Sequence, residues 1–404
     1  MANYVIPLVT VPYLTRILGV EAWGEIALAQ VVLQYFILLV DYGFSWSAVR
    51  QISEERGDRD AISRIFNATW CAQWLLLGVS VFILFAIVII IPMLRNVWQL
   101  YVAGFAVVLG QVLFPIWLMQ GLERLREVAA IQFFTRLLLI LPIFLLVNSP
   151  EDILLAMVIQ SIGGVISGVL CLYLINRDRI IIWRWPSWVD VWCAFKSGGE
   201  LFLSRGWISL YTHMIPLILG IVAGTTAVGI YSLADRIRNM AQSLLQPISQ
   251  AVFPRMSHLY AHDVKEAQLL LVKSLSVVFV VAAPVSLGLF VMADWIILVI
   301  GGSKFHEAAD VLRWLSIVPL AVGLSNVFGV QVMIPNGRVK AFNLIVGIAG
   351  ICAIVSIFPF SSHYGAVGAA RVTLIVELIV TGMMAFYLQR AGFFQKIGNV
   401  LPKL

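Results

Sequence analysis

Long apolar runs recur from one end of the chain to the other, and short polar or charged segments separate them. A helix needs about 20 apolar residues to cross a bilayer, and inside lipid its backbone groups are satisfied within the helix itself. The pattern therefore predicts an all-α polytopic membrane protein with about twelve transmembrane helices. The predicted spans are 1–14, 25–48, 67–92, 98–120, 128–147, 153–175, 200–222, 229–255, 272–292, 311–333, 342–358 and 367–388.

The first predicted span is short for a bilayer, and it contains Pro7 and Pro12. Proline removes a backbone donor and disturbs a helix interior. We therefore expect a shortened first helix.

Two spans carry polar side chains that lipid does not tolerate. The eighth contains Asp235, Arg236 and Arg238, and each such charge costs about 2.5–3.5 kcal/mol at a helix centre. Its leucines, worth about −0.5 kcal/mol each, do not offset that cost. The second span places four polar side chains on one helical face: Gln30, Gln34, Asp41 and Ser45. Both helices are expected to face protein or a wet cavity.

The longest loop, residues 176–199, divides the predicted spans into two sets of six. Its segment 180–188 mixes Trp with Arg, which is typical of chain lying in the headgroup layer. We therefore predict an N-terminal lobe, residues 1–185, and a C-terminal lobe, residues 186–404.

An internal repeat supports this division. A displacement of 205 residues brings the second span onto the eighth and matches Gly24 with Gly229, Leu28 with Leu233, Ala29 with Ala234 and Arg50 with Arg255. Residues 17–20 also resemble residues 218–221, with a short insertion between. Two related bundles of six helices are an architecture that transporters use.

The basic residues lie mostly in one set of alternate loops. That set holds eighteen Lys and Arg, whereas the other set holds only Arg16, Arg95 and Lys304. By the positive-inside rule both termini are expected in the cytoplasm of a multi-pass protein. A net charge of +6 therefore reflects membrane orientation, and no nucleic-acid partner is expected.

Composition argues against an enzyme. Hydrophobic residues make up 61% of the chain and charged residues 12%, whereas soluble domains carry about 25% charged residues. No large hydrophilic stretch is present in which a catalytic domain could fold, and the sequence contains no nucleotide-binding motif, metal cluster or nucleophile triad. We expect no enzyme activity and no metal or cofactor.

Six motifs along the chain resemble those of a known family, the Wzx-type O-antigen flippases. These flippases form the polysaccharide transporter family of the multidrug/oligosaccharidyl-lipid/polysaccharide (MOP) exporter superfamily. The motifs are PLVTVPYLTRILG at 7–19 followed by Trp23-Gly24, DYGF at 41–44, FPIWLMQG at 114–121, QPISQAVFPR at 246–255, LSNVFGVQVM at 324–333 and GAVGAA at 365–370.

The resemblance implies the MOP flippase fold, with two six-helix lobes around a central cavity. It also implies a flippase that moves undecaprenyl-diphosphate-linked O-antigen repeat units across the bacterial inner membrane by alternating access. The implied partners are the lipid-linked oligosaccharide, inner-membrane lipids, an O-antigen polymerase and a chain-length regulator. H⁺ or Na⁺ coupling stays open. The alternatives are an ion-coupled exporter of another substrate, such as a drug-type antiporter, and a membrane glycosyltransferase or polymerase.

Arginine suits a diphosphate because it stays charged and binds phosphate oxygens bidentately. The candidate diphosphate-binding residues are Arg205, Arg236, Arg238, Arg16 and Arg50. The candidate glycan-lining residues are Gln34, Tyr211, Tyr231, Gln242 and Gln246. The candidates for ion coupling are Asp41, Asp235 and His213.

Structural roles compete with each of these assignments. Asp235 can neutralise Arg238, three residues further along the helix, and Arg236 or Arg238 can reach the headgroups. Arg16 and Arg50 stand at helix ends, where they can anchor the protein to lipid headgroups. His213 can be a satisfied interior histidine, and aromatic residues at this density also occur in ordinary membrane packing.

Overall fold

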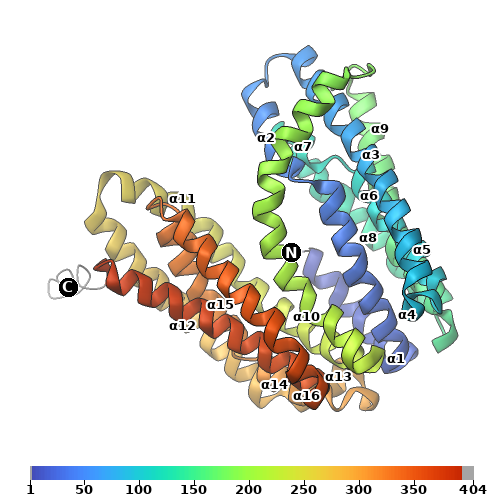
Figure 1. Cartoon of the computed structure of the whole chain (residues 1–404), viewed down its shortest axis with the longest axis vertical. Coiled ribbons are helices and arrows are strands. Elements are labelled where there is room, and N and C mark those ends of the chain that lie inside the picture. Colours follow the sequence, from blue (N-terminus) through green and yellow to red (C-terminus); the bar gives the residue numbers. More distant parts are fainter. Residues whose placement is uncertain (1, 394–404) are drawn as a thin grey trace. The chain divides into compact units, whose positions relative to one another are not determined.

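A computed structural model describes residues 2–393, with side chains for all of these except 2–7, 93, 200–201, 203–212, 250–251, 261 and 264. Every element in this range is helical (Figure 1). The chain packs as two compact units, Met1–Ser209 and Leu210–Leu404. This division falls inside the helix α10, whose first part packs with the first unit. The lobe boundary at residue 185 stays a prediction.

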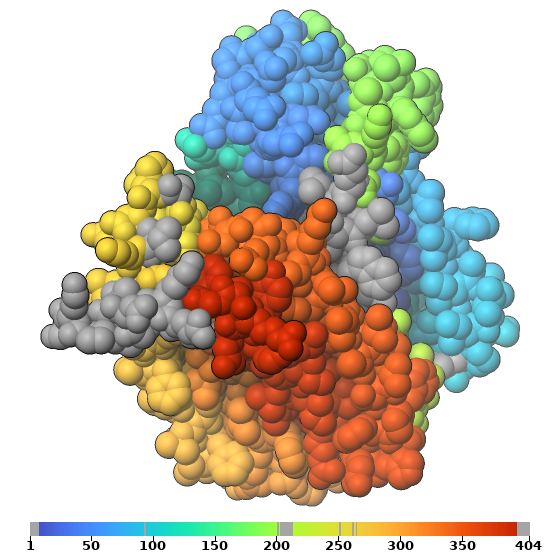
Figure 2. Space-filling model, turned by 60° about the vertical axis from the view of Figure 1, so that its left-hand side comes forward, coloured from blue at the N-terminus to red at the C-terminus, as the bar shows by residue number. Residues whose placement is uncertain are grey.

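The first unit contains ten helical elements before α10. They are α1 (Ala2–Asp41), α2 (Phe44–Glu54), α3 (Arg59–Ile90), α4 (Pro92–Arg95), α5 (Trp98–Gly104), α6 (Ala106–Leu113), α7 (Ile116–Gly121), α8 (Leu125–Leu146), the 3₁₀ turn η1 (Pro150–Asp152) and α9 (Ile153–Arg177). Figure 2 shows the blue surface around the α2–α3 turn beside the green surface at the start of α10.

The second unit begins within α10 (Trp188–Gln242). The elements that follow are η2 (Ser243–Leu245), α11 (Gln246–His262), α12 (Val264–Val291), α13 (Ala293–Gly301), η3 (Ser303–Phe305), α14 (Ala308–Leu315), α15 (Val318–Asn326), the π-helix η4 (Val327–Met333) and α16 (Val339–Arg390).

Nine helical segments of the described chain are long and apolar enough to cross a membrane. Three of them contain a glycine with non-helical backbone angles, at Gly19, Gly224 and Gly365, so that each joins two helices. Figure 1 shows this in α16, whose orange first half and red second half meet near the label and run in opposite directions. The predicted polytopic fold with about twelve crossings is confirmed. The first helix extends past Pro12 and breaks only at Gly19.

The breaks at Gly19 and Gly224 have nearly the same geometry. Gly19 has φ 78° and ψ −176°, and Gly224 has φ 82° and ψ 176°. They stand 205 residues apart, the displacement at which the two halves of the sequence match. The sequence similarity between 17–20 and 218–221 would pair Gly19 with Gly220, but the break shows that its counterpart is Gly224. The repeat therefore needs no insertion here.

Replacing Gly224 with alanine is expected to lower the free energy of unfolding by about 1–3 kcal/mol, because this region of φ and ψ is almost restricted to glycine. No other atom lies within 4 Å of the added Cβ, so the cost comes from the backbone alone. The measurement is thermal unfolding of the purified protein in detergent. Gly347→Ala is the matched control, since its added Cβ also meets open space and Gly347 lies in regular helix. Equal unfolding temperatures for the two variants would contradict the prediction.

The helices α6 and α9 approach each other closely through glycines. A Cβ on Gly110 would lie 2.5 Å from the carbonyl carbon of Gly164, and a Cβ on Gly168 would lie 2.4 Å from the Cβ of Leu113. Gly164 and Gly168 are four residues apart, the small-residue spacing that lets membrane helices pack backbone against backbone. This contact holds the centre of the first unit together.

An ion-pair network joins the start of α8 to the end of α9. Arg124 Nε donates to Glu127 at 2.8 Å, and the same guanidinium pairs with Asp178. Arg177 Nε also donates to Asp178, at 2.9 Å. The hydrogen bonds from Arg124 and Arg177 hold the pKa of the Asp178 carboxyl below its ordinary value. The charged turn at 123–127 is thus tied to the next helical hairpin.

Candidate functional site

A polar cluster lies on the second half of α10, within the second unit. Arg238 Nη2 pairs with Asp235, and its Nη1 donates to Gln242 Oε1 at 2.8 Å. Asn239 Nδ2 donates to the other oxygen of Asp235 at 2.9 Å. These residues follow at spacings of three and four, which places them on one face of the helix. The expected pairing of Asp235 with Arg238 is present in the structure.

The second half of α16 supplies the other side of this cluster. Tyr231 and Thr373 share a hydrogen bond of 2.9 Å between their hydroxyl groups. One turn beyond Thr373, Glu377 is placed to interact electrostatically with Arg238. Sequence reasoning missed Glu377 as a member of the cluster. The available signal was an isolated carboxylate in an otherwise apolar span.

Arg238 is shielded from solvent, and its side chain is only 13% exposed. A guanidinium has five N–H donors in a fixed fork. The donor Nε of Arg238 is buried and has no acceptor, while its terminal nitrogens hold Asp235 and Gln242. The N–H donors of a guanidinium bind phosphate oxygens as they bind carboxylates. The cluster is therefore chemically suited to hold a phosphate.

Two further predicted residues of the second unit, Arg236 and His213, lie within electrostatic reach of Asp235. Arg236 and His213 are half-buried, and Gln246 is exposed at the start of α11. Tyr231 is only 4% exposed and its hydroxyl bonds to Thr373. Its role in lining a glycan site stays a prediction. The side chain of Tyr211 lies outside the described residues.

The predicted span 229–255 is not one continuous α-helix. The helix α10 ends at Gln242, and the 3₁₀ turn Ser243–Leu245 separates it from α11. A 3₁₀ turn has three residues per turn in place of 3.6, so it rotates the following helix by about 60° over three residues. Gln246 therefore leaves the face that carries Asp235 and Gln242.

In the first unit, Asp41 stands at the end of α1, at a break in the helix. Tyr42 and Gly43 have φ of 42° and 80°, and α2 begins at the next residue. Ser45 donates a hydrogen bond to the carboxylate of Asp41. Asp41 is buried, with 7% of the residue exposed. The predicted polar face thus brings Asp41 and Ser45 together. A buried carboxylate at a helix break can take up a proton or a small cation.

The start of α10 packs on this break. The ring of Tyr42 stacks on Phe202 at 4.8 Å, and a Cβ on Gly198 would lie 2.7 Å from the Tyr42 carbonyl oxygen. Only glycine allows this approach. The DYGF motif is therefore a junction between α1, α2 and α10 within the first unit.

The remaining candidates of the first unit occupy more open positions. Arg16 is exposed on α1, and Gln34 is half-buried on the same helix. The side chain of Arg50 is 74% exposed and pairs with Glu54 at 3.8 Å, which agrees with anchoring at the membrane surface. Arg205 lies among the residues whose side chains are not described.

Within the part of the chain that the structure describes, no group of three or more His, Cys, Asp or Glu side chains is placed to hold a metal ion. Elsewhere in the second unit, the guanidinium of Arg371 lies over the rings of Trp314 and Tyr364, at 4.9 and 4.5 Å from their centroids.

Many apolar crossings with charged side chains gathered inside a helical unit define a class of protein, the polytopic membrane transporters. The family follows from comparison. Residues 1–260 match the model of a family described as polysaccharide biosynthesis protein. The chain therefore belongs to this family, in agreement with the resemblance to polysaccharide transporters that the sequence showed.

Relatives with curated names cover nearly the whole chain. A protein of Escherichia coli K12 named "Putative O-antigen transporter" is 31% identical over 392 residues, which cover 96% of this chain and 94% of that protein. A protein of Shigella dysenteriae with the same name is 28% identical over 386 residues, covering 95% and 96%.

Solved structures share the fold. An inward-facing multidrug resistance MATE family transporter of the MOP superfamily has a TM-score of 0.75 and 13% identity, and the match covers 100% of this chain and 96% of that one. The lipid II flippase MurJ in an inward closed conformation has a TM-score of 0.71 and 14% identity, covering 99% and 89%. At these identities the likeness is one of fold.

Proposed function

We propose that this protein is a flippase that moves undecaprenyl-diphosphate-linked O-antigen repeat units across the bacterial inner membrane by alternating access. The observation that carries the proposal is Arg238, a shielded cation with a free donor inside an apolar unit. Relatives named as O-antigen transporters support the substrate, and they favour transport over glycan synthesis or polymerisation.

The chemistry of the substrate fits this cluster. A lipid-linked diphosphate carries anionic oxygens that hydrocarbon cannot solvate, and an arginine contact at 4 Å is worth about 4 kcal/mol at an effective dielectric near 20. In the resting cluster Arg238 already holds Asp235. A phosphate oxygen that displaces Asp235 exchanges one ion pair for another, so the net gain is smaller than for an isolated contact. Because the two ion pairs of Arg238 are similar in energy, the diphosphate can bind and can also be released.

Ion coupling follows from the same exchange. Protonation of Asp235 or Glu377 would weaken their hold on Arg238 and leave the guanidinium to the diphosphate. Asp41 and His213 are further candidates for H⁺ or Na⁺ coupling, each within a membrane-spanning segment. A coupled cycle of this kind needs no other cofactor.

The proposed orientation places both termini in the cytoplasm, as the distribution of Lys and Arg favours. The O unit would be taken from the inner leaflet and released to the outer one. An O-antigen polymerase and a chain-length regulator would act on it there, and inner-membrane lipids would surround the protein throughout.

Complementation of a flippase-null strain tests the proposal. The protein is expressed in strains that assemble different O units of known structure, and surface lipopolysaccharide is separated by electrophoresis. We expect O-antigen display with at least one O unit, together with loss of the lipid-linked unit that accumulates in the parent strain. Normal membrane abundance without display of any O unit would contradict the proposal, and elongation of glycan by the purified protein alone would indicate an enzyme.

A further inference from the structure

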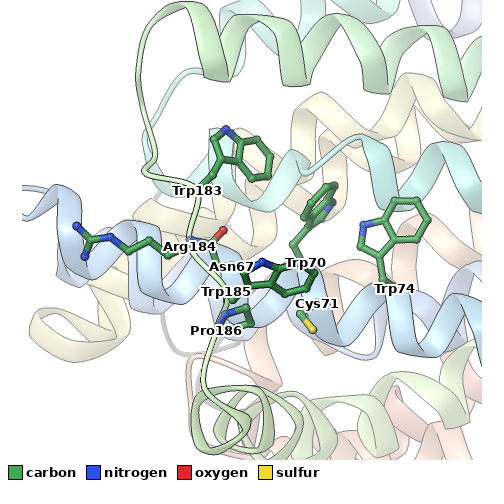
Figure 3. Close-up of a pocket in the computed structure, with 8 residues that line it drawn as sticks. All are labelled: Asn67, Trp70, Cys71, Trp74, Trp183, Arg184, Trp185 and Pro186. Carbon is green, nitrogen blue, oxygen red and sulfur yellow. The ribbon is translucent and has the colours of Figure 1, made fainter.

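A cavity of about 460 Å³ opens in the first unit between α3 and the segment that follows α9 (Figure 3). Four tryptophans and Cys71 contribute to its walls, with Arg184 at one end. The lining residues are Asn67, Trp70, Cys71, Trp74, Trp183, Arg184, Trp185 and Pro186. None of them belongs to the polar clusters described above.

Polar side chains of α3 hold the wall of this cavity in place. Asn67 Nδ2 donates to the carbonyl oxygen of Ile182 at 2.9 Å, and Ser63 Oγ accepts from the Ile182 amide at 2.8 Å. The next residue, Trp183, packs edge-on against Trp70, with ring centroids 5.2 Å apart. The segment after α9 is therefore fixed against α3, and the cavity is a formed feature of the unit.

The position of the cavity along α3 places it at a membrane boundary. The helix has 32 residues and is about 48 Å long, whereas the hydrocarbon layer is about 30 Å thick. The far half of α3 exposes large apolar side chains, such as Phe82 at 76% and Ile90 at 74%, which suit lipid. Counting back from the C-terminal end of α3 at Ile90, about 20 residues of helix span the roughly 30 Å of hydrocarbon and reach Trp70. The boundary of the hydrocarbon layer therefore falls close to Trp70. Tryptophan is enriched at this depth.

The cavity is apolar at one end and cationic at the other. Figure 3 shows Arg184 directed away from the end at which Trp74 lies. Arg184 pairs with Asp60 at 3.2 Å, but both side chains are about two-thirds exposed, at 66% and 67%. An exposed ion pair of this kind contributes little and exchanges readily with other anions. Arg59 and Arg64 stand on the first turns of α3, and Asp58 caps the helix. With Arg184 and Asp60, three arginines stand against two aspartates, an excess of one positive charge.

We propose that this cavity binds one anionic phospholipid of the leaflet at the N-terminal end of α3. Its phosphate would take the place of Asp60 at Arg184, and an acyl chain would lie along Trp70 and Trp74. The charge favours an anionic headgroup over a zwitterionic one. The lining offers few hydrogen-bonding groups, because Asn67 is already bonded to Ile182, so a glycan would find few partners. The proposal does not depend on the transported substrate.

Cys71 gives a direct test, because its thiol lines the cavity. The full-length protein with Cys171→Ala, Cys193→Ser and Cys352→Ala is placed in nanodiscs of phosphatidylcholine, or of phosphatidylcholine and phosphatidylglycerol in equal parts. The rate of Cys71 alkylation by a small maleimide is then measured. Phosphatidylglycerol should slow alkylation by about fivefold, the preference that one basic residue near the surface gives to anionic lipid.

Two variants separate a bound lipid from a general effect of membrane charge. Arg184→Gln should abolish the slowing, whereas Arg126→Gln, an exposed arginine on α8 outside the cavity, should retain it. Monodisperse elution of each variant shows that it is folded, and Trp74→Ala provides a second way to weaken the site if Arg184→Gln is unstable.

Equal rates in the two membranes would overturn the proposal, as would unchanged slowing in Arg184→Gln. Native mass spectrometry gives an independent measurement: one retained phosphatidylglycerol supports the assignment. Retention of only phosphatidylcholine, or of lipid-linked oligosaccharide in its place, contradicts it.

Discussion

Arg238→Gln abolishes O-antigen display in a complemented flippase-null strain, which is the largest functional effect we expect from a single substitution. The neutral amide keeps a donor near Gln242 but loses the charge that would bind the diphosphate. Display is measured by electrophoresis of surface lipopolysaccharide, with membrane abundance measured in the same cells.

Loss of display alone does not separate phosphate binding from stability. Removing Arg238 takes its cationic partner from the Asp235 carboxylate, which keeps only the hydrogen bond from Asn239. Breaking a fully buried pair costs about 3–5 kcal/mol, and this partly exposed pair costs less. The double variant Asp235→Asn/Arg238→Gln removes both charges of the pair, so neither is left without the other. We expect normal abundance from the double variant but still no display. Recovery of display would show that Arg238 serves only to neutralise Asp235.

Gly110→Ala is expected to give the largest loss of stability, about 1–3 kcal/mol or more, because overpacking against a backbone cannot be relieved by a rotamer change. The added methyl group would lie 2.5 Å from the carbonyl carbon of Gly164 and 2.8 Å from the amide nitrogen of Val165. The helices α6 and α9 would have to separate. Thermal unfolding in detergent measures the effect.

Gly78→Ala is the matched control for this substitution. Gly78 also lies within a membrane-spanning helix, and a Cβ there meets no atom within 4 Å. Alanine at Gly78 should be neutral or stabilising by up to about 1 kcal/mol, since glycine is a poorer helix former. An unfolding temperature for Gly110→Ala as high as that of Gly78→Ala would show that α6 and α9 do not depend on this contact.

Local spacing made part of the fold and site predictable. Asp235 and Arg238 stand three residues apart on a helix, so their pairing follows from helix geometry. The apolar runs likewise indicated the crossings. What they could not show was that Gly19 or Gly224 alone would join two helices, because a glycine in an apolar run has the same hydropathy in a straight helix as at a break.

Contacts between residues far apart in the chain could not be predicted from the sequence. Glu377 comes within electrostatic reach of Arg238 only because α16 lies against α10, and Asn67 bonds to Ile182 across 115 residues. The 3₁₀ turn before Gln246 gave no clear signal either, since Ser243–Leu245 fits an ordinary helix by composition. Spacing along one helix predicts its own face, whereas the partner of that face depends on tertiary packing.

The single-residue connections at Gly19, Gly224 and Gly365 have a consequence for biogenesis. Two helices joined by one residue cannot be far apart at any stage of insertion, so each pair must pass from the ribosome into the bilayer as one hairpin. The second half of α10, with Asp235, Arg236 and Arg238, would be a poor substrate for the insertion machinery by itself. Tethered through Gly224 to its more apolar neighbour, it is carried across with that neighbour, before any contact with α16 has formed.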